Sequence, residues 1–431
     1  MSKKRIQGIV GIFLVLTVVS SFFGCSEKSV NAPPPTSIKV TVKSAADSSL
    51  IIGANVVLYN ANSGEAILRV SSSTAGTAEF DNLTEGSFFI RIAAQGFKEL
   101  PIENVSPIPF SVSTWETYTQ TYYLDTLQGT YGKIDGSIIP AQSGFLVVAT
   151  STSFGTDIHS YSGPDGYFAL FNVPFGTYQV YAVKSGYISS DKPQVNLSAG
   201  SNNINIQLTM NQVQGSTLTG MVTFLAITNG IIDISLLDKN SLSVISGLTT
   251  RTDPGRNFTI MKIPAGDYIA WATYENDGFV MDPDWLFKNP GALNLSFTTD
   301  ISATLDFSVT GAITIISPTN PDETIIPAVA DSVIPTFRWE AYPQAKEYII
   351  EVRDLNGNLV WGGFDSTGQV RHSQIPQQHN SAEFNFDGSA LAQLHTGQIY
   401  QWRIYADDDA ALNVQTLLSS SEDQKGMFIL P

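Results

Sequence analysis

Apolar and polar residues alternate along most of the chain after residue 36. In residues 166–183, apolar side chains recur at every second position in two short runs, and Pro174, Phe175 and Gly176 separate the runs. A two-residue period places apolar side chains on one face of a strand, and proline and glycine favour the turn between strands. We expect Gly176 to take a positive φ there. Because no window of eleven or more residues after Cys25 shows a convincing 3.6-residue period, the pattern predicts an all-β protein.

The alternating pattern recurs with a period of ninety residues. The first copy holds Gly76, Phe80, Leu83, Gly86, Phe88, Gly96 and Phe97, and the second holds Gly166, Leu170, Val173, Gly176, Tyr178, Gly186 and Tyr187. A third copy keeps Ile260, Ile263, Gly266 and Tyr268 in step, has Arg256 in place of the first glycine, and inserts two residues before Gly278 and Phe279. A regular period of this kind indicates duplicated structural units.

These repeated segments, together with Ile52–Leu58, resemble carboxypeptidase regulatory-like domains. That resemblance implies transthyretin-like (prealbumin-like) β-sandwiches over residues 37–127, 128–210 and 211–311, with the third copy divergent. It also implies non-catalytic accessory domains, because the shared motif is turn chemistry and strand alternation and so specifies a fold. We expect the sandwiches to stand in series, each burying its own core.

Residues 312–431 have a different character. Trp339 lies in an early strand, Glu347–Arg353 forms an apolar strand, and Tyr400, Trp402 and Ile404 share one face of a late strand. This arrangement resembles a fibronectin type III domain, an immunoglobulin-like β-sandwich. The resemblance implies that Tyr400 is the tyrosine corner, whose hydroxyl makes a hydrogen bond to backbone upstream.

The N-terminus has the layout of a secretory leader. Residues 2–5 carry three positive charges, and residues 6–23 are uncharged and rich in Ile, Val, Leu and Phe. The segment ends at Cys25 in a stretch that resembles a bacterial lipobox, followed by a proline-rich polar tether over residues 25–36. We therefore expect residues 1–24 to be a lipoprotein signal peptide and Cys25 to be acylated, so that lipid anchors an outer membrane lipoprotein in the cell envelope. The alternative is an uncleaved membrane anchor, because 18 apolar residues could just span a bilayer.

Charge and cysteine content narrow the function classes. The formal charge is −16, and removal of Lys3, Lys4 and Arg5 with the leader makes it −16 − 3 = −19. Phosphate backbones repel such a surface, so we expect no nucleic-acid partner. The single cysteine excludes a disulfide framework and a cysteine zinc site.

Motifs for catalysis, cofactors and metals are missing from the sequence. The four histidines have no zinc-protease spacing, and no G-x-S-x-G is present. We expect no catalytic residues, no cofactor and no bound metal, and hence not an enzyme. His372 and His379 are expected to be solvated in a polar loop, as is the acidic run 407–409. Calcium at 282–284 or 407–409 stays an open alternative.

Aromatic residues are the stronger functional hint. The alternating pattern does not clearly place every large aromatic residue on a buried strand face. The residues in question are Trp115, Trp271, Trp285, Trp361, Tyr274 and Phe279. Exposed rings stack on sugars or fill protein pockets. The loop of the third repeat combines rings and carboxylates in Tyr274, Asp282, Asp284 and Trp285, which are our candidate ligand-binding residues. Two functions remain: a non-enzymatic envelope protein acting in adhesion, scaffolding or protein interaction, and a carbohydrate-binding surface lipoprotein.

Overall fold

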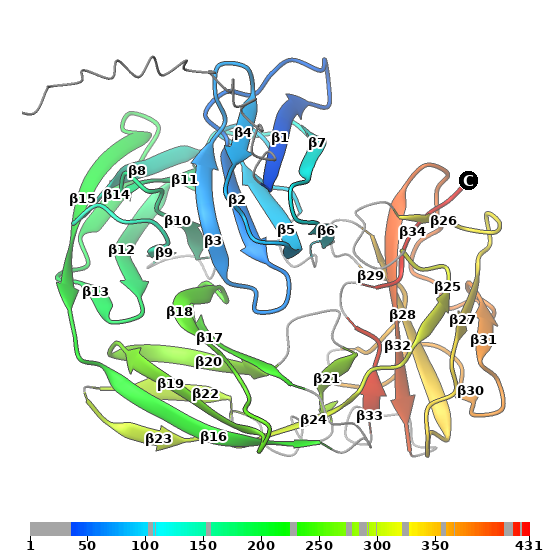
Figure 1. Ribbon diagram of the computed structural model, residues 1–431. Coiled ribbons are helices and arrows are strands. Elements are labelled where there is room, and N and C mark those ends of the chain that lie inside the picture. The colour runs from blue at the N-terminus through cyan, green and yellow to red at the C-terminus, as the bar shows by residue number, and fades with distance from the viewer. Residues whose placement is uncertain are drawn as a thin grey trace, which may run out of the picture. The chain divides into compact units, whose positions relative to one another are not determined.

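All elements with described bounds in the computed structural model are β-strands (Figure 1), which confirms the all-β prediction. The structure describes residues 36–101, 107, 109–151, 157–224, 231–272, 278–283, 291, 293–298, 300–320, 327–354, 359–365, 367–408, 417–422 and 425–431. Among these residues, no helix is long and apolar enough to cross a membrane.

The strands form four sets, which we call the first to fourth modules. The first module comprises β1 (Ser37–Ser44), β2 (Asn55–Asn60), β3 (Ala66–Ser71), β4 (Thr77–Phe80), β5 (Gly86–Ala93), β6 (Phe110–Val112) and β7 (Thr117–Leu124). The second comprises β8 (Gly132–Ile139), β9 (Leu146–Ser151), β10 (Ile158–Tyr161), β11 (Tyr167–Val173), β12 (Gly176–Lys184), β13 (Tyr187–Ser189), β14 (Gln194–Leu197) and β15 (Asn203–Gln212).

The remaining strands complete the third and fourth modules. The third module comprises β16 (Ser216–Phe224), β17 (Asp233–Asp238), β18 (Val244–Arg251), β19 (Asn257–Ile263), β20 (Gly266–Ala272), β21 (Phe279–Met281), β22 (Asn294–Phe297), β23 (Ser302–Thr304) and β24 (Phe307–Gly311). The fourth comprises β25 (Ile315–Ser317), β26 (Ala328–Val329), β27 (Thr336–Trp339), β28 (Glu347–Asp354), β29 (Leu359–Gly362), β30 (Ile375–Pro376), β31 (Ser381–Glu383), β32 (Ile399–Asp407), β33 (Leu417–Ser420) and β34 (Met427–Ile429).

The first three modules share one topology. In each, the first strand pairs in parallel with a late strand: β1 with β7, β8 with β15, and β16 with β23 and β24. The first strand also pairs antiparallel with the strand before the connection at residues 84–86, 174–176 or 264–266: β4, β11 and β19 respectively. In the first and third modules a separate second sheet completes the module, β3-β2-β5-β6 and β18-β17-β20-β22 respectively, whereas in the second module β13 joins β12 to β15, so that the strands form one continuous path.

The ninety-residue period is also present in the backbone. Gly76, Gly166 and Arg256 have φ values of 67°, 76° and 66°, so the arginine keeps the left-handed turn that glycine makes in the other copies. Asn82, Asn172 and Lys262 likewise have φ values of 57°, 55° and 61°. These repeated conformations, rare for non-glycine residues, show that the copies fold alike.

The expectation that Gly176 takes a positive φ is wrong, and the same holds for its equivalents Gly86 and Gly266. Each begins a strand, and the left-handed residue of the connection stands four positions earlier, at Asn172 in the second module. Close packing gives a different reason for glycine at one of these positions. A Cβ on Gly266 would lie 3.2 Å from the hydroxyl oxygen of Tyr268, the residue two positions along the same strand face.

The fourth module buries its aromatic residues in a core of its own. Trp339, Trp361 and Trp402 are fully buried there, together with Tyr348 and Phe337. The hydroxyl oxygen of Tyr400 accepts a hydrogen bond from the backbone N–H of His395 (2.9 Å), which is the upstream contact expected of a tyrosine corner.

The first three modules are not independent sandwiches in series. One buried apolar cluster contains Tyr59 and Phe89 of the first module, Leu146 and Tyr161 of the second, and most of the core of the third. The first and second modules each keep a further core. The first and second modules thus keep the cores of their own that we expect, and in addition the first three modules share one buried cluster, because several strands bury apolar side chains on both faces.

Candidate functional site

The first three modules meet at a junction of buried apolar residues. The rings of Tyr59 and Phe89 stack with centroids 4.7 Å apart, and Tyr161 of the second module meets Tyr59 edge to face at 5.8 Å. The Tyr161 hydroxyl then donates to the backbone carbonyl of Val244 in the third module (2.7 Å). Tyr161, which is 1% exposed, thus connects all three modules.

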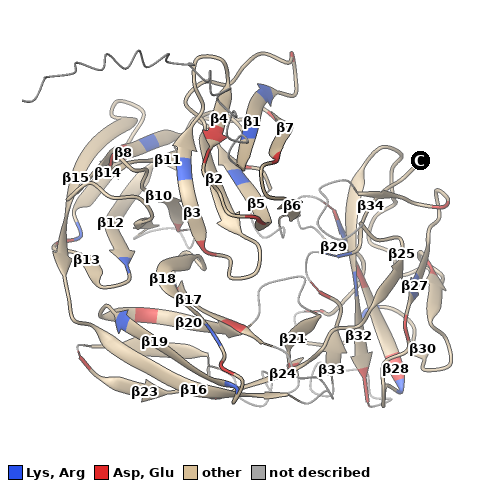
Figure 2. Cartoon of the chain, viewed as in Figure 1, with Lys and Arg blue, Asp and Glu red and all other residues tan. Residues whose placement is uncertain are grey.

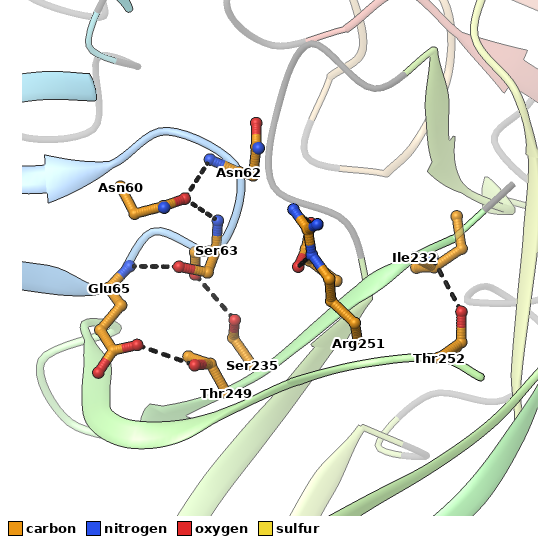
Figure 3. Close-up of polar contacts among 10 residues, drawn as sticks. Asn60, Asn62, Ser63, Glu65, Ile232, Ser235, Thr249, Arg251 and Thr252 are labelled. Carbon is orange, nitrogen blue, oxygen red and sulfur yellow. Dashed lines mark hydrogen bonds and ion pairs between the residues drawn. The ribbon is translucent and has the colours of Figure 1, made fainter. Parts of the chain in front are cut away.

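A tight turn between β2 and β3 connects the first module to the third (Figure 3). The side-chain oxygen of Asn60 accepts hydrogen bonds from the N–H groups of Asn62 (2.8 Å) and Ser63 (3.0 Å), which sets the turn. The turn then presents the Ser63 carbonyl, which accepts from the Ser235 hydroxyl of β17 (2.8 Å). The local fold of the turn therefore places its backbone against the third module.

Glu65, which follows the same turn, is held by β18 of the third module. One carboxylate oxygen accepts from the N–H of Gly247 (2.7 Å) and the other from the hydroxyl of Thr249 (2.9 Å). Hydrogen bonds that involve an ionised group are stronger than neutral ones. The first and third modules are therefore fastened directly, although more than 170 residues separate the bonded groups.

Asn172 fastens the first module to the second. Its amide nitrogen donates to the carbonyls of Ala94 (3.0 Å) and Phe97 (2.8 Å), and its side-chain oxygen accepts from the N–H of Gly96 (2.7 Å). Asparagine tolerates the left-handed backbone that this β-bulge requires. One side chain thus satisfies three backbone groups of the neighbouring module.

The glycine of each Gly-aromatic pair donates its N–H to the following module. Gly96 donates to the Asn172 side chain (2.7 Å), Gly186 to the Lys262 carbonyl (2.7 Å), and Gly278 to the Glu422 carboxylate. The carbonyls of the same glycines accept from Leu127, Val213 and Ala312, which begin the next connection. The three glycines have φ values of 81°, 74° and 79°, which explains why glycine recurs at this position.

Two further polar contacts are buried at the junction. The Arg69 guanidinium donates to the Asn55 side-chain oxygen (2.9 Å) and lies over the ring of Tyr167 at 5.0 Å. Burial lowers the pKa of Arg69. The Tyr181 hydroxyl donates a hydrogen bond to the Asp238 carboxylate (2.7 Å). Burial is the main cause that raises the pKa of Tyr181, and the negative charge of Asp238 raises it further. These side chains face protein partners, and the contacts are structural.

A cavity of about 720 Å³ opens where the three modules meet. Its walls come from β5 and the Gly96 turn, from β10 and the bulge of β11, and from the β17–β18 loop. The lining includes Arg91, Phe97, His159, Phe171, Leu242 and Ser243. Cavities of this size at domain interfaces, with aromatic walls and a few polar groups, are typical of small-ligand sites.

Among the lining residues, His159 and Ser243 form a pair across the second and third modules. The Ser243 hydroxyl lies 2.8 Å from the His159 Nε2 atom. Burial, with a further contribution from the Arg91 guanidinium, lowers the pKa of His159 to about 4. A general base works best when its pKa is near the operating pH. The imidazole is therefore neutral at pH 7 and poorly matched to activating a serine, so we interpret the pair as a polar contact at the cavity wall.

The lowered pKa of His159 predicts acid sensitivity. Its ordinary pKa is near 6.5, so between pH 6.5 and about 4 the unfolded chain binds a proton that the folded chain does not. The stability associated with neutral His159 is present above pH 6.5 and is lost as the pH falls to about 4. Because Asp157 and Arg91 also face the cavity, a variant must isolate the histidine.

Between pH 7.5 and pH 4.5, the free energy of unfolding of His159→Gln is expected to fall by roughly 2 kcal/mol less than that of the wild-type chain. Urea unfolding of both chains at pH 7.5 and pH 4.5 measures it, and the difference between the two chains cancels the contribution of the carboxylates. His379→Gln, in the fourth module, is the control. If the free energy of unfolding fell by the same amount in the wild-type chain and in His159→Gln over this pH range, the prediction would be wrong.

The four candidate ligand residues of the third repeat are only partly described. Asp282 lies just after β21 and is 5% exposed, and its N–H donates to the Ser308 carbonyl (3.0 Å). Tyr274, Asp284 and Trp285 lie outside the described residues, as does Cys25.

Three other aromatic candidates differ in how far they are buried. Trp361 is fully buried, and its indole N–H donates to Asp387 and Ser389 (both 3.2 Å), so it is a core residue. Trp271 packs partly buried against the shared cluster. Trp115 is 62% exposed, so here alternation correctly left a ring unburied.

The predictions about solvated polar groups in the fourth module are wrong for His372 and Asp407, whereas His379 is exposed as expected and Asp409 lies outside the described residues. His372 is buried; its Nε2 atom accepts from the N–H of Ile350 (2.9 Å) and its Nδ1 atom lies 2.6 Å from the Ser373 carbonyl. Asp407 is also fully buried, opposite Glu347 on the neighbouring strand. Both sit on or against β28, in the interior of the module. In the described part of the chain, no group of three or more His, Cys, Asp and Glu residues could hold a metal ion.

Sequence reasoning missed the junction, although the chain carries a signal for it. Leu146–Ala149 of β9 and Asn55–Tyr59 of β2 are buried without interruption. A continuous apolar run indicates a strand covered on both faces, whereas alternation indicates one buried face. Runs of this kind could have predicted that the modules cover one another.

No family model matches the chain, and no curated protein matches it. Among solved structures, the chain is similar to the TIE protein of Bacillus anthracis, with 14% identity over 64% of this chain and 51% of that one and a TM-score of 0.19. It is also similar to a streptococcal ancillary pilin (10% identity, 63% and 98% coverage, TM-score 0.18) and to BcpA, the major pilin subunit of Bacillus cereus (9%, 63% and 99%, TM-score 0.18). At these values the likeness assigns neither a family nor a function.

Proposed function

We propose that this chain is a non-enzymatic cell-surface protein that acts in adhesion or scaffolding. The observation that carries the proposal is the direct fastening of the first module to the third through Glu65 and Ser63. Modules joined only by short linkers can move relative to one another, whereas a large apolar interface holds them together. A fastened block keeps a fixed surface at a distance from the point of attachment, which suits adhesion and scaffolding.

The described charged groups support a structural role more than a catalytic one. The buried Arg69 and Asp238 are engaged by neighbouring side chains and backbone, and charged residues are sparse along the strands (Figure 2). Catalysis needs a titratable group with a pKa matched to its task in an accessible cleft. The pKa of His159, at about 4, does not meet that condition.

The finer part of the proposal concerns attachment. The apolar leader and Cys25 support a lipid-anchored outer membrane lipoprotein of the cell envelope. The tether of residues 25–36 would then separate the first module from the lipid. Partners would be the membrane, through the anchor, and another envelope protein or a glycan.

Expression of Cys25→Ser in a bacterial host tests the attachment. We expect the wild-type chain in the membrane fraction, with mass spectrometry showing loss of residues 1–24 and an acylated Cys25. The Cys25→Ser chain should lose acylation, because serine has no thiol to carry the lipid, and should also keep the leader, because removal of residues 1–24 depends on the modified cysteine. Ser26→Ala is the control. A wild-type chain that keeps residues 1–24 and carries no acyl group on Cys25 would contradict the lipoprotein and support the uncleaved anchor.

Carbohydrate binding is the second candidate function. The aromatic-walled cavity among the first three modules favours it, because rings supply flat apolar contact area at low entropic cost. The loop with Tyr274, Asp282, Asp284 and Trp285 remains a separate proposal, tested by loss of glycan binding in Trp285→Ala.

A further inference from the structure

The cavity among the first three modules is walled by groups that the fold has already positioned. Phe97 follows the Gly96 turn that Asn172 fastens, and Phe171 immediately precedes Asn172 in the bulge of β11. Both rings are half-buried and line the cavity. The Asn172 side chain donates two hydrogen bonds to the backbone near Phe97 and accepts a third from it, so the two segments that carry the rings are positioned relative to each other before any ligand arrives.

The rim of the cavity carries an exposed apolar side chain at a left-handed backbone position. Leu242 is 58% exposed and has a φ of 54°, because it stands at the left-handed position of the β17–β18 hairpin, where its N–H donates to the Asp238 carbonyl (2.9 Å). Asp238 holds the loop, because its Oδ1 atom accepts from the N–H groups of Asn240 (3.1 Å) and Ser241 (2.8 Å). The turn thus presents the Leu242 side chain at the cavity rim.

The polar groups of the cavity are also oriented. The Ser243 hydroxyl faces His159, and the Asn240 amide nitrogen donates to the Tyr181 hydroxyl (2.8 Å). Hydroxyl, amide and imidazole groups can both donate and accept hydrogen bonds, as a ligand rich in hydroxyl groups requires. The lining therefore combines apolar rings with neutral polar groups.

The charges of the lining balance. Arg91 and Lys98 are opposed by Glu99 and Asp157, and the chain as a whole has a formal charge of −16. Neither a strongly anionic nor a strongly cationic ligand finds a complementary field there. The balance favours an uncharged ligand.

A peptide that binds by pairing as an extra strand with a sheet edge fits this cavity wall less well than an oligosaccharide does. The cavity is lined by β10, which ends its sheet path, with β11 at the opposite end of the same path. The Asn55 side chain donates to the Ser160 hydroxyl of β10 (3.2 Å) and to the Ala169 carbonyl of β11 (2.7 Å). The first module thus occupies the space between the two edges, where a strand-adding peptide would pair.

We propose that the cavity among the first three modules binds a segment of a neutral oligosaccharide. The sugar rings stack on Phe97 and Phe171, an apolar face contacts Leu242, and hydroxyl groups bond to Ser243 and Asn240. The proposal rests on the second candidate function above and places the binding site at the junction.

The test uses the full chain and a panel of neutral gluco-, galacto-, manno- and xylo-oligosaccharides from trisaccharide to hexasaccharide, screened on an array and titrated by calorimetry. Leu242→Gly removes the rim side chain where glycine relieves the backbone, so the variant should fold at least as stably as the wild-type chain. We expect it to weaken binding roughly fivefold or more, since the ligand loses apolar contact. Ser243→Ala should weaken binding by a similar factor through a lost hydrogen bond.

Trp115→Gly is the matched control. Trp115 is also an exposed apolar residue at positive φ (62% exposed, 65°), but it does not line the cavity. We expect its affinity to stay within about twofold of the wild-type value, which is a fraction of a kcal/mol.

Three results would overturn the proposal: no binding across the neutral panel by folded chain, binding of acidic oligosaccharides or peptides only, or binding that Trp115→Gly weakens and Leu242→Gly leaves unchanged. None of these results concerns the acylation of Cys25 or the hydrogen bonds between the modules. The proposed surface role is therefore tested separately from the binding site.

Discussion

Tyr161→Ala is expected to destabilise the first three modules together, by about 3–5 kcal/mol. Tyr161 is 1% exposed, its ring packs against Tyr59 of the first module, and its hydroxyl bonds to Val244 of the third. The variant leaves a cavity in the shared core and removes the hydroxyl that bonds to a buried carbonyl. Calorimetric and urea unfolding should therefore show one cooperative transition shifted to lower temperature and lower urea.

Two variants separate the contributions to that effect. Tyr161→Phe keeps the ring and removes only the hydroxyl, which should cost about 1 kcal/mol. Tyr123→Ala truncates a tyrosine that is 50% exposed, and we expect it to change stability by less than ~0.5 kcal/mol. If Tyr161→Ala instead produced a separate early transition of the second module, the modules would not share one cooperative core.

Gly220→Ala is expected to destabilise the third module by more than ~4 kcal/mol or to prevent folding. A Cβ on Gly220 would lie 1.8 Å from the Leu305 carbonyl oxygen and 2.6 Å from the Phe258 ring, so backbone as well as a side chain must move. Gly136→Ala in the second module meets the same obstacle, with the Ile206 carbonyl oxygen at 1.9 Å. Both glycines allow close approach of a neighbouring segment rather than an unusual φ.

Soluble yield, followed by thermal unfolding of any folded fraction, measures the effect. Gly200→Ala is the control, because its Cβ would meet nothing within 4 Å and its backbone has no left-handed φ. If the free energy of unfolding of Gly220→Ala were within about 1 kcal/mol of the wild-type value, the strands would be able to separate at this point without loss of packing, and the prediction would be wrong.

Local chemistry made the repeats recognisable in the sequence. Alternation over residues 166–183 predicted strands, and the ninety-residue spacing predicted equivalent units; left-handed backbone recurs at Gly76, Gly166 and Arg256. These features depend on the preferences of a few neighbouring residues. The detail of the Gly176 turn was misread, because a β-bulge at Asn172 could relocate the positive φ without altering the alternation.

The candidate site was much less predictable. Nothing in the sequence marks Glu65 or Asn172 as a contact between modules, and the groups to which they bond lie more than 70 residues away in the chain. His372 and Asp407 were misplaced for the same reason, since a polar residue in a loop or at a strand end carries no mark of what covers it. Burial of a polar group depends on whether a distant segment supplies hydrogen bonds.

From its residues alone, this chain could be identified as a series of repeated β-structures with a leader-like N-terminus and no recognisable catalytic motif. Strand period and turn chemistry are local properties, so a single sequence records them. Folding in three dimensions settled which strand faces meet, that the first module bonds to the third, and where a cavity remains between them. Those outcomes depend on contacts between groups more than 80 residues apart, and no local pattern encodes such a pairing.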